Sequence, residues 1–146
     1  MPADAIKILL IEDNPAEANL TKEALGEWKT PNTVQVVNNG EDALKYLRQI
    51  EKYAGVPRPD LIFLDLNLPK RHGREILQEI KSDPTLRGIP VIILTVSEAD
   101  SDVITAYNLY ANSYINKTLD FNKFIAMMQK IEEYWFNVVT LPKNGQ

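Results

Sequence analysis

Three short apolar runs in this chain each end in a polar side chain, and this arrangement limits the folds open to it. KILLIED ends in Glu12 and Asp13, LIFLD ends in Asp65, and IPVIILT ends in Thr95. Runs this apolar are typical of strands buried on both faces of a parallel sheet. Because a carboxylate is costly to bury without compensation, we expect these side chains at the open edge where each strand ends.

The apolar runs alternate with longer segments of helical period, which is the pattern of βα units. The predicted strands are Lys7 to Ile11, Thr33 to Val37, Leu61 to Leu64, Val91 to Leu94 and Ser113 to Ile115. Five such units predict an α/β fold of the flavodoxin-like (βα)5 type. Its doubly wound parallel sheet should have the strand order 2-1-3-4-5.

The segments between the predicted strands carry residues typical of helix N-termini and apolar residues at helical spacing. The predicted N-caps are Asn14 and Asp120. Pro15 suits the first helical position after Asn14. The predicted helices begin at Pro15 and after Gly40, then cover Gly73 to Ser82, Asp100 to Leu109, and Asp120 to about Phe136. The expected core-facing residues are Leu20, Ala24, Trp28, Ala43, Leu44, Leu47, Ile50, Ile76, Leu77, Ile80, Phe121, Phe124, Ile125, Met128, Ile131 and Trp135.

Length and composition favour one soluble domain over residues 1–146, in which residues 137–146 form a C-terminal tail. Of the 146 residues, 45% are hydrophobic and 25% charged, and the net charge is -4. The chain has no basic cluster, which argues against nucleic acid as a partner. The absence of cysteine excludes a disulfide framework and a thiolate zinc site. No segment is typical of a signal peptide or a membrane span, so we expect a cytoplasmic protein without membrane attachment.

The predicted strand order brings the polar strand ends together. Strands 1 and 3 become neighbours, so Glu12, Asp13 and Asp65 should converge. A divalent cation would relieve their mutual repulsion, and an oxygen donor set favours Mg²⁺ over zinc. Thr95 would add a hydroxyl and Lys117 an ammonium group from the flanking strands. Such a site suits phosphoryl transfer, in which catalysis is mainly positioning and charge stabilisation.

The motifs ILLIEDN, LIFLDLNLPKRHG, VIILTVS and YINK, in this order, resemble the response-regulator receiver domain of two-component signalling. The resemblance covers the chain up to about residue 136. It implies that Asp65 is the phosphoacceptor and that Asp13 is a direct magnesium ligand. It further implies a water-mediated metal contact from Glu12 and a third contact from the backbone carbonyl of Asn67.

The same resemblance assigns roles on the flanking strands. Thr95 and Lys117 would hold oxygens of the phosphoryl group, and Tyr114 would be an aromatic switch residue that moves with Thr95. Pro69 and Gly73 fall where the family shapes the loop after the phosphoacceptor. Such a domain is a signalling switch and not an enzyme, although it assists its own phosphorylation and dephosphorylation.

Three segments resemble the sequences of stand-alone response regulators that partner phytochrome histidine kinases in cyanobacteria and other bacteria. They are DLNLPK, KSDPTLRGIPVIILT and EEYWFNVVTLP. This implies a sensor histidine kinase, of the bacterial phytochrome type, as the phosphoryl donor. We expect Glu17, Thr21 and the 118–119 loop to be exposed and to contribute to kinase choice. With no effector domain expected after Phe136, output should be by protein contact.

A wide apolar surface on the last helix predicts a homodimer. Met127, Tyr134 and Val138 extend the apolar residues beyond one helix face. We expect the dimer to form through the fourth helix, the fifth strand and the fifth helix, with the tail helping to cover the interface.

Two residues depart from the family pattern. Thr118 follows Lys117 where the family usually has a proline joined by a cis bond, and a cis bond to threonine would cost about 2.5 to 4 kcal/mol. Val96 stands where a small residue is usual. Its branched side chain should obstruct water, which predicts a long-lived phosphoprotein and faster loss of phosphate in a Val96→Ala variant.

Two other functions are compatible with the same strand ends. One is a degenerate receiver that acts as a phosphorylation-independent scaffold. The other is a phosphohydrolase with an aspartyl nucleophile, but that chemistry generally needs a second acid two residues later, and Asn67 cannot protonate a leaving group. His72, the single histidine, is expected to be a solvated loop residue.

Overall fold

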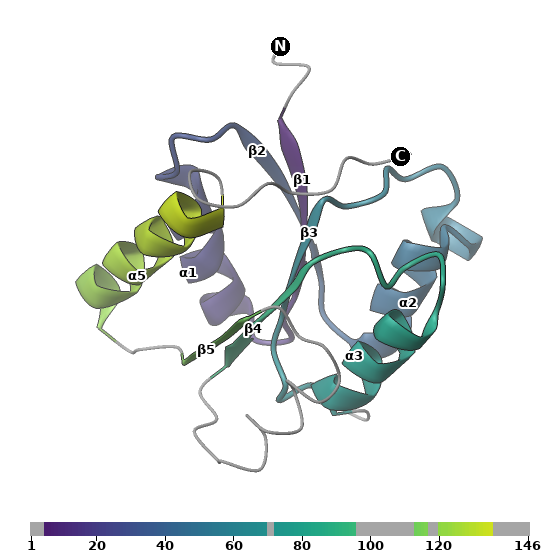
Figure 1. Cartoon of the computed structure of the whole chain (residues 1–146). Helices are drawn as coiled ribbons and strands as arrows, with labels where there is room; N and C mark the ends of the chain where they lie inside the picture. The colour runs from purple at the N-terminus through teal and green to yellow at the C-terminus, as the bar shows by residue number, and fades with distance from the viewer. Residues whose placement is uncertain (1–4, 70–71, 96–112, 117–119, 136–146) are drawn as a thin grey trace.

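The structure is a computed structural model that describes residues 5–69, 72–95, 113–116 and 120–135. Its strands are β1 (Ile6–Ile11), β2 (Asn32–Val37), β3 (Leu61–Leu64), β4 (Val91–Thr95) and β5 (Ser113–Asn116). Its helices are α1 (Pro15–Gly26), α2 (Gly40–Arg48), α3 (Gly73–Ser82) and α5 (Phe121–Glu133), and a 3-10 turn covers Glu51–Tyr53 (Figure 1). The predicted helix over 100–109 and the tail over 137–146 lie outside the described residues.

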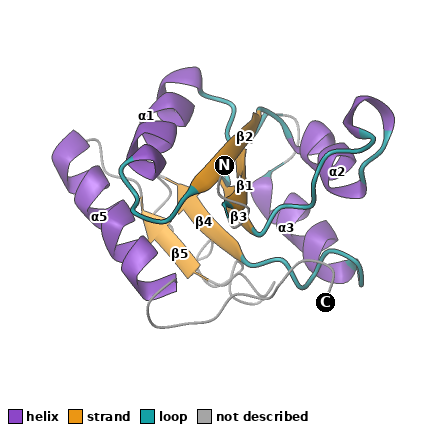
Figure 2. Ribbon diagram, turned by 90° about the horizontal axis from the view of Figure 1, so that it is seen from above, coloured by secondary structure: helices purple, strands orange, loops and turns teal. Residues whose placement is uncertain are grey.

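The sheet confirms the predicted topology. All strand pairs are parallel, and the strand order is β2-β1-β3-β4-β5. Figure 2 shows α1 and α5 on one face of the sheet and α2 and α3 on the other. No helix within the described ranges is long and apolar enough to cross a membrane.

The core has two layers because alternate residues of the central strands point to opposite faces. Leu9 and Ile11 of β1 pack with α2 and α3, whereas Ile8 and Leu10 pack with α1 and α5. Alternate residues of β3 and β4 also point to opposite faces of the sheet and pack into the two core layers. All side chains of these two strands are buried. This two-sided burial is why the central strands are continuous apolar runs.

Both predicted N-caps are confirmed. The Asn14 side chain accepts a hydrogen bond from the backbone N–H of Glu17, with 3.1 Å between Oδ1 and N. Asp120 accepts from the backbone N–H of Lys123 in the same way, at 3.0 Å. The first turns of α1 and α5 are therefore held at defined positions relative to the carboxyl edge of the sheet.

Three expectations about exposure were wrong. Ile50 is 45% exposed, because α2 ends at Arg48 and Gln49 takes a left-handed conformation. Phe121, the first residue of α5, is 49% exposed. Thr21 was expected at the surface but is 1% exposed. Helical periodicity gives the direction of a side chain, but not whether a neighbouring element extends far enough to cover it.

Candidate functional site

Glu12 and Asp65 lie side by side at the carboxyl edge of the sheet. Ile11, the last residue of β1, is in register with Leu64, the last residue of β3, so the next residue of each strand is an acid. The backbone N–H of Asp65 donates to the carbonyl of Ile11 at 3.1 Å. The two acids are 2% and 5% exposed, respectively. The structure thus places two buried carboxylates together, as the strand order predicted.

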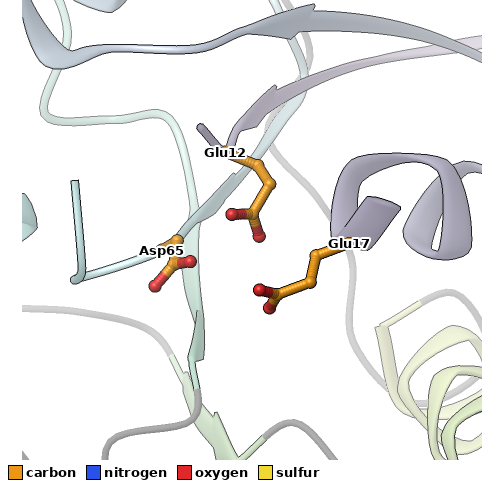
Figure 3. A group of neighbouring side chains, drawn as sticks. All are labelled: Glu12, Glu17 and Asp65. Atoms are coloured by element: carbon orange, nitrogen blue, oxygen red, sulfur yellow. The ribbon is translucent and has the colours of Figure 1, made fainter. Parts of the chain in front are cut away.

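A third carboxylate joins this pair from α1. One carboxylate oxygen from each of Glu12, Glu17 and Asp65 lies within 4.8 Å of the others. Figure 3 shows the three side chains converging from the end of β1, the first turn of α1 and the end of β3. Glu17 was expected to be exposed and to contribute to kinase choice, but it is partly buried and belongs to this group. Its spacing from the Asn14 cap places it in the first turn of α1, but that spacing does not specify the direction of its side chain.

Asp13, the predicted direct metal ligand, lies outside this three-carboxylate group. Its side chain is exposed and lines a neighbouring cavity of about 540 Å³ together with Asn39, Asp42 and Pro69, among others. It is adjacent in sequence to Glu12, but successive residues at a strand end point in different directions. Its role as a ligand remains a prediction.

Asn67 connects the predicted phosphoacceptor to Thr95. The backbone N–H of Asn67 donates to Oδ1 of Asp65 at 3.0 Å, and its side-chain amide donates to Oγ1 of Thr95 at 3.3 Å. Thr95 is the last residue of β4 and is fully buried. The structure therefore places Asp65, Asn67 and Thr95 in one hydrogen-bonded group.

Gly73 packs directly against the backbone of Asp65. A Cβ atom at this position would lie 2.5 Å from the carbonyl oxygen of Asp65 and 2.6 Å from Cα of Leu66. The N–H of Gly73 donates to the carbonyl of Leu66 at 2.8 Å, which fixes the start of α3 beside the residue that follows Asp65. Only glycine fits this approach without a shift of the backbone.

His72 has a structural role that the sequence did not predict. It is the N-cap of α3: its Nδ1 accepts from the backbone N–H of Arg74 at 3.1 Å. The Glu75 side chain accepts from the backbone N–H of His72, which completes a capping box. The residue lies in the loop before α3, as expected, but the prediction missed its capping role, in which an imidazole nitrogen replaces the usual capping oxygen.

Two predicted site residues are described only in part or not at all. Tyr114 lies on β5, paired with Ile93 of β4, and its backbone alone is described. Lys117 lies outside the described residues, as do Val96 and Thr118. Asn116, which precedes the lysine, is the last residue of β5 and pairs with Thr95.

The three-carboxylate group has the composition of a site for a hard divalent cation. Its donors are all carboxylate oxygens, which Mg²⁺, Mn²⁺ and Ca²⁺ prefer over nitrogen or sulfur. Two of the three acids are buried, so a cation would offset charges that are expensive to leave together. Glu12, Glu17 and Asp65 therefore form one group of described side chains that could hold such a cation.

Comparison with known proteins identifies related sequences over most of the chain. The sequence model for the response regulator receiver domain matches residues 8–129. The response regulator Rcp1 of Synechocystis sp. is 43% identical over 135 residues, which is 92% of each chain.

Solved structures show the same relationship. The phosphorylated cyanobacterial phytochrome response regulator RcpA has a TM-score of 0.90 and 47% identity, covering 95% of this chain and 99% of that one. The Mn²⁺-bound form of Rcp1 has a TM-score of 0.88 and 42% identity, covering 94% and 99%.

Proposed function

The chain belongs to the response regulator receiver domain family, and from this premise we propose that Asp65 is the residue that accepts the phosphoryl group. The observation that carries the proposal is the buried pairing of Asp65 with Glu12, in hydrogen-bonded contact with Asn67 and through it with Thr95. Phosphorylation-controlled signalling is the activity of this family, and related regulators act in phytochrome signalling.

In the proposed reaction, an Asp65 carboxylate oxygen attacks the phosphorus atom of a kinase phosphohistidine. The new O–P bond forms as the P–N bond breaks, and the electron pair of that bond remains on the histidine nitrogen. The Asn67 N–H holds one oxygen of Asp65 in place. The Thr95 hydroxyl, at the end of β4, and Lys117 would bind the transferred phosphoryl group.

Receiver domains bind a divalent metal, and we infer that Mg²⁺ is the cation used by this chain. When bound, it neutralises negative charge on the phosphoryl oxygens. Glu12, Asp65, Asp13 and the backbone carbonyl of Asn67 are the proposed ligands. The buried, all-oxygen character of the Glu12 and Asp65 pair supports this assignment.

We propose that phosphorylation is transmitted by a coupled movement of Thr95 and Tyr114. Loss of the Asn67 contact would free the Thr95 hydroxyl to bind the phosphoryl group, and Tyr114 on the neighbouring strand would follow. A differential stabilisation of a few kcal/mol is enough to shift such a two-state equilibrium substantially. The signal would then pass by protein contact through the surface of the predicted fourth helix, which lies outside the described residues, and β5.

The proposed partners are a phytochrome-type histidine kinase in the cytoplasm and a second copy of this chain. Similarity to RcpA and Rcp1 supports the first. The second is supported by the position of β5 at the edge of the described sheet and by the exposure of Phe121 (49%) and Tyr134 (52%) at the two ends of α5. Monomeric elution of both phosphorylation states at micromolar concentration would contradict the dimer.

The decisive experiment is incubation of the chain with acetyl phosphate and Mg²⁺, followed by intact-protein mass spectrometry. We expect one stable phosphoryl group on the native chain and none on Asp65→Asn. Asp60→Asn is the matched control, because Asp60 lies at the opposite end of β3 and accepts from the backbone of Lys7 at 2.8 Å. Continuous release of phosphate would instead indicate the phosphohydrolase, and absence of any modification would indicate the scaffold.

A further inference from the structure

The first turn of α3 is held by His72, the single histidine of the chain. Its Nδ1 atom accepts a hydrogen bond from the backbone N–H of Arg74 at 3.1 Å, and the Glu75 side chain accepts from the backbone N–H of His72 at 3.2 Å. The carbonyl of His72 accepts from the backbone N–H of Glu75 at 2.9 Å. One of the three hydrogen bonds at the start of α3 therefore depends on an imidazole nitrogen.

This capped turn lies directly against the proposed phosphoacceptor. The N–H of Gly73 donates to the carbonyl of Leu66 at 2.8 Å, and a Cβ atom on Gly73 would lie 2.5 Å from the carbonyl oxygen of Asp65. No side chain of Gly73 separates the two backbones, so a shift in the first turn of α3 changes the packing against Asp65. The His72 cap is one residue away from this contact.

An imidazole nitrogen accepts a hydrogen bond only while it carries no proton. The bond from Arg74 to Nδ1 therefore places the proton of the neutral ring on Nε2. Protonation of Nδ1 replaces the acceptor with a second donor and puts a positive charge at the positive end of the helix dipole. Histidine ordinarily changes charge between about pH 5 and 8. The capping oxygens of asparagine, serine and threonine do not titrate in this range.

The charged residues around His72 provide no ion pair for a protonated ring within the described residues. Three of the four charged residues that flank it in sequence are cations: Lys70 and Arg71, which lie outside the described ranges, and Arg74, with Glu75 as the acid. The charged groups at the neighbouring strand ends are Glu12, Asp13 and Asp65. Titration of these acids affects the native chain and a His72 variant alike, so a comparison of the two isolates the histidine.

We propose that His72 is a positioning residue for the phosphorylation of Asp65 and makes this reaction sensitive to pH. The neutral ring holds the first turn of α3 against the backbone of Asp65, and the protonated ring releases the N–H of Arg74 and loosens that turn. The inference rests on the proposed function, because it concerns the reactivity of the same acid. A cap that served stability alone would leave the phosphorylation rate of the folded chain unchanged.

The test compares phosphorylation rates of the untagged native chain and His72→Asn with acetyl phosphate and saturating MgCl₂, followed by intact-protein mass spectrometry. His72→Asn is the matched control, because it keeps a capping oxygen that does not titrate. We expect the ratio of the native rate to the His72→Asn rate to fall about two- to fivefold between about pH 8 and pH 5.5, as for loss of one helix cap. His72→Ala, which lacks a cap, should be slower than His72→Asn at both pH values.

A second measurement follows the hydrogen bond itself. The single histidine gives one set of imidazole signals in ¹⁵N NMR spectra, and at about pH 8 these should show a proton on Nε2 and none on Nδ1. The amide exchange of Arg74 should accelerate as the ring is protonated, while circular dichroism shows that the chain stays folded. A proton on Nδ1 at about pH 8, or equal rate ratios at the two pH values, would overturn the proposal.

The failure of this inference can be separated from the failure of the proposed function. If Asp65 is phosphorylated at both pH values and the ratio of the native rate to the His72→Asn rate does not change, His72 is a stability cap and the receiver function stands. If neither protein takes up a phosphoryl group at about pH 8 with MgCl₂ present, both proposals are wrong.

Discussion

The side-chain amide of Asn67 donates a hydrogen bond to the hydroxyl of Thr95, with 3.3 Å between Nδ2 and Oγ1. The same residue donates its backbone N–H to Asp65. One asparagine therefore bridges the ends of β3 and β4 between the proposed phosphoacceptor and the residue expected to bind the phosphoryl group. The bridge gives a direct physical connection between the two strands.

This bridge can be measured with a double-mutant cycle of Asn67→Ala and Thr95→Val. We expect a coupling free energy of about 0.5 to 1.5 kcal/mol in chemical unfolding, the usual value of one hydrogen bond. Free energies of unfolding that add without coupling would show that the contact contributes nothing to stability.

Gly73→Ala should disturb the phosphoacceptor loop. The added Cβ would meet the backbone of Asp65 and Leu66 at 2.5 and 2.6 Å, and neither group can rotate away. We expect a loss of about 1 to 3 kcal/mol in the free energy of unfolding and slower phosphorylation by acetyl phosphate. Gly88→Ala is the control, since nothing lies within 4 Å of the equivalent position there. Equal behaviour of the two variants would contradict the close packing.

Lys81 should make stability depend on pH above neutrality. Partial burial lowers the pKa of Lys81 from 10.5 to about 8. Its ammonium group donates to the carbonyls of Arg87 and Ile89 at 3.1 and 2.8 Å. Between about pH 8 and 10.5 the unfolded chain binds a proton that the folded chain lacks, so raising the pH through this window favours folding.

Urea unfolding at pH 7.5 and 10 checks this effect. Relative to Lys81→Met, which cannot titrate, the native chain should gain free energy of unfolding as the pH rises. The gain should be about 1 kcal/mol, well below the full value of the shift, because solvent screens a partly exposed group. Parallel pH profiles for the two proteins would refute the assignment.

Trp28, two residues after the end of α1, links that end of the helix to α5 through a buried hydrogen bond. Its indole N–H donates to the carbonyl of Met128 at 3.0 Å, and its ring lies edge-on to Phe63 with 6.3 Å between centroids. Trp28→Phe keeps an aromatic ring but removes the donor, so we expect a loss of about 1 to 3 kcal/mol in thermal or chemical unfolding.

Trp135→Phe is the matched substitution at the other tryptophan of the chain, which is only partly buried. We expect a smaller loss there. A loss at Trp28 no greater than at Trp135 would mean that the α1 to α5 contact is not important for stability.

Much of the fold was predictable because it depends on local pattern and on the general rules of parallel sheets. The apolar runs identified all five strands, and the Asn14 and Asp120 caps marked the starts of α1 and α5. The strand order followed from the number of βα units, and it predicted that Glu12 and Asp65 would lie together.

The sequence by itself determined which strands end in acids, because a strand buried on both faces can place a charge only where it leaves the sheet. The tertiary structure decided which acids converge. Asp13 is adjacent to Glu12 in sequence yet lies outside the group, whereas Glu17 enters it from the first turn of α1. The physical reason is that convergence depends on the direction of each side chain and on how the Asn14 cap orients the helix against the sheet, and spacing along the chain specifies neither.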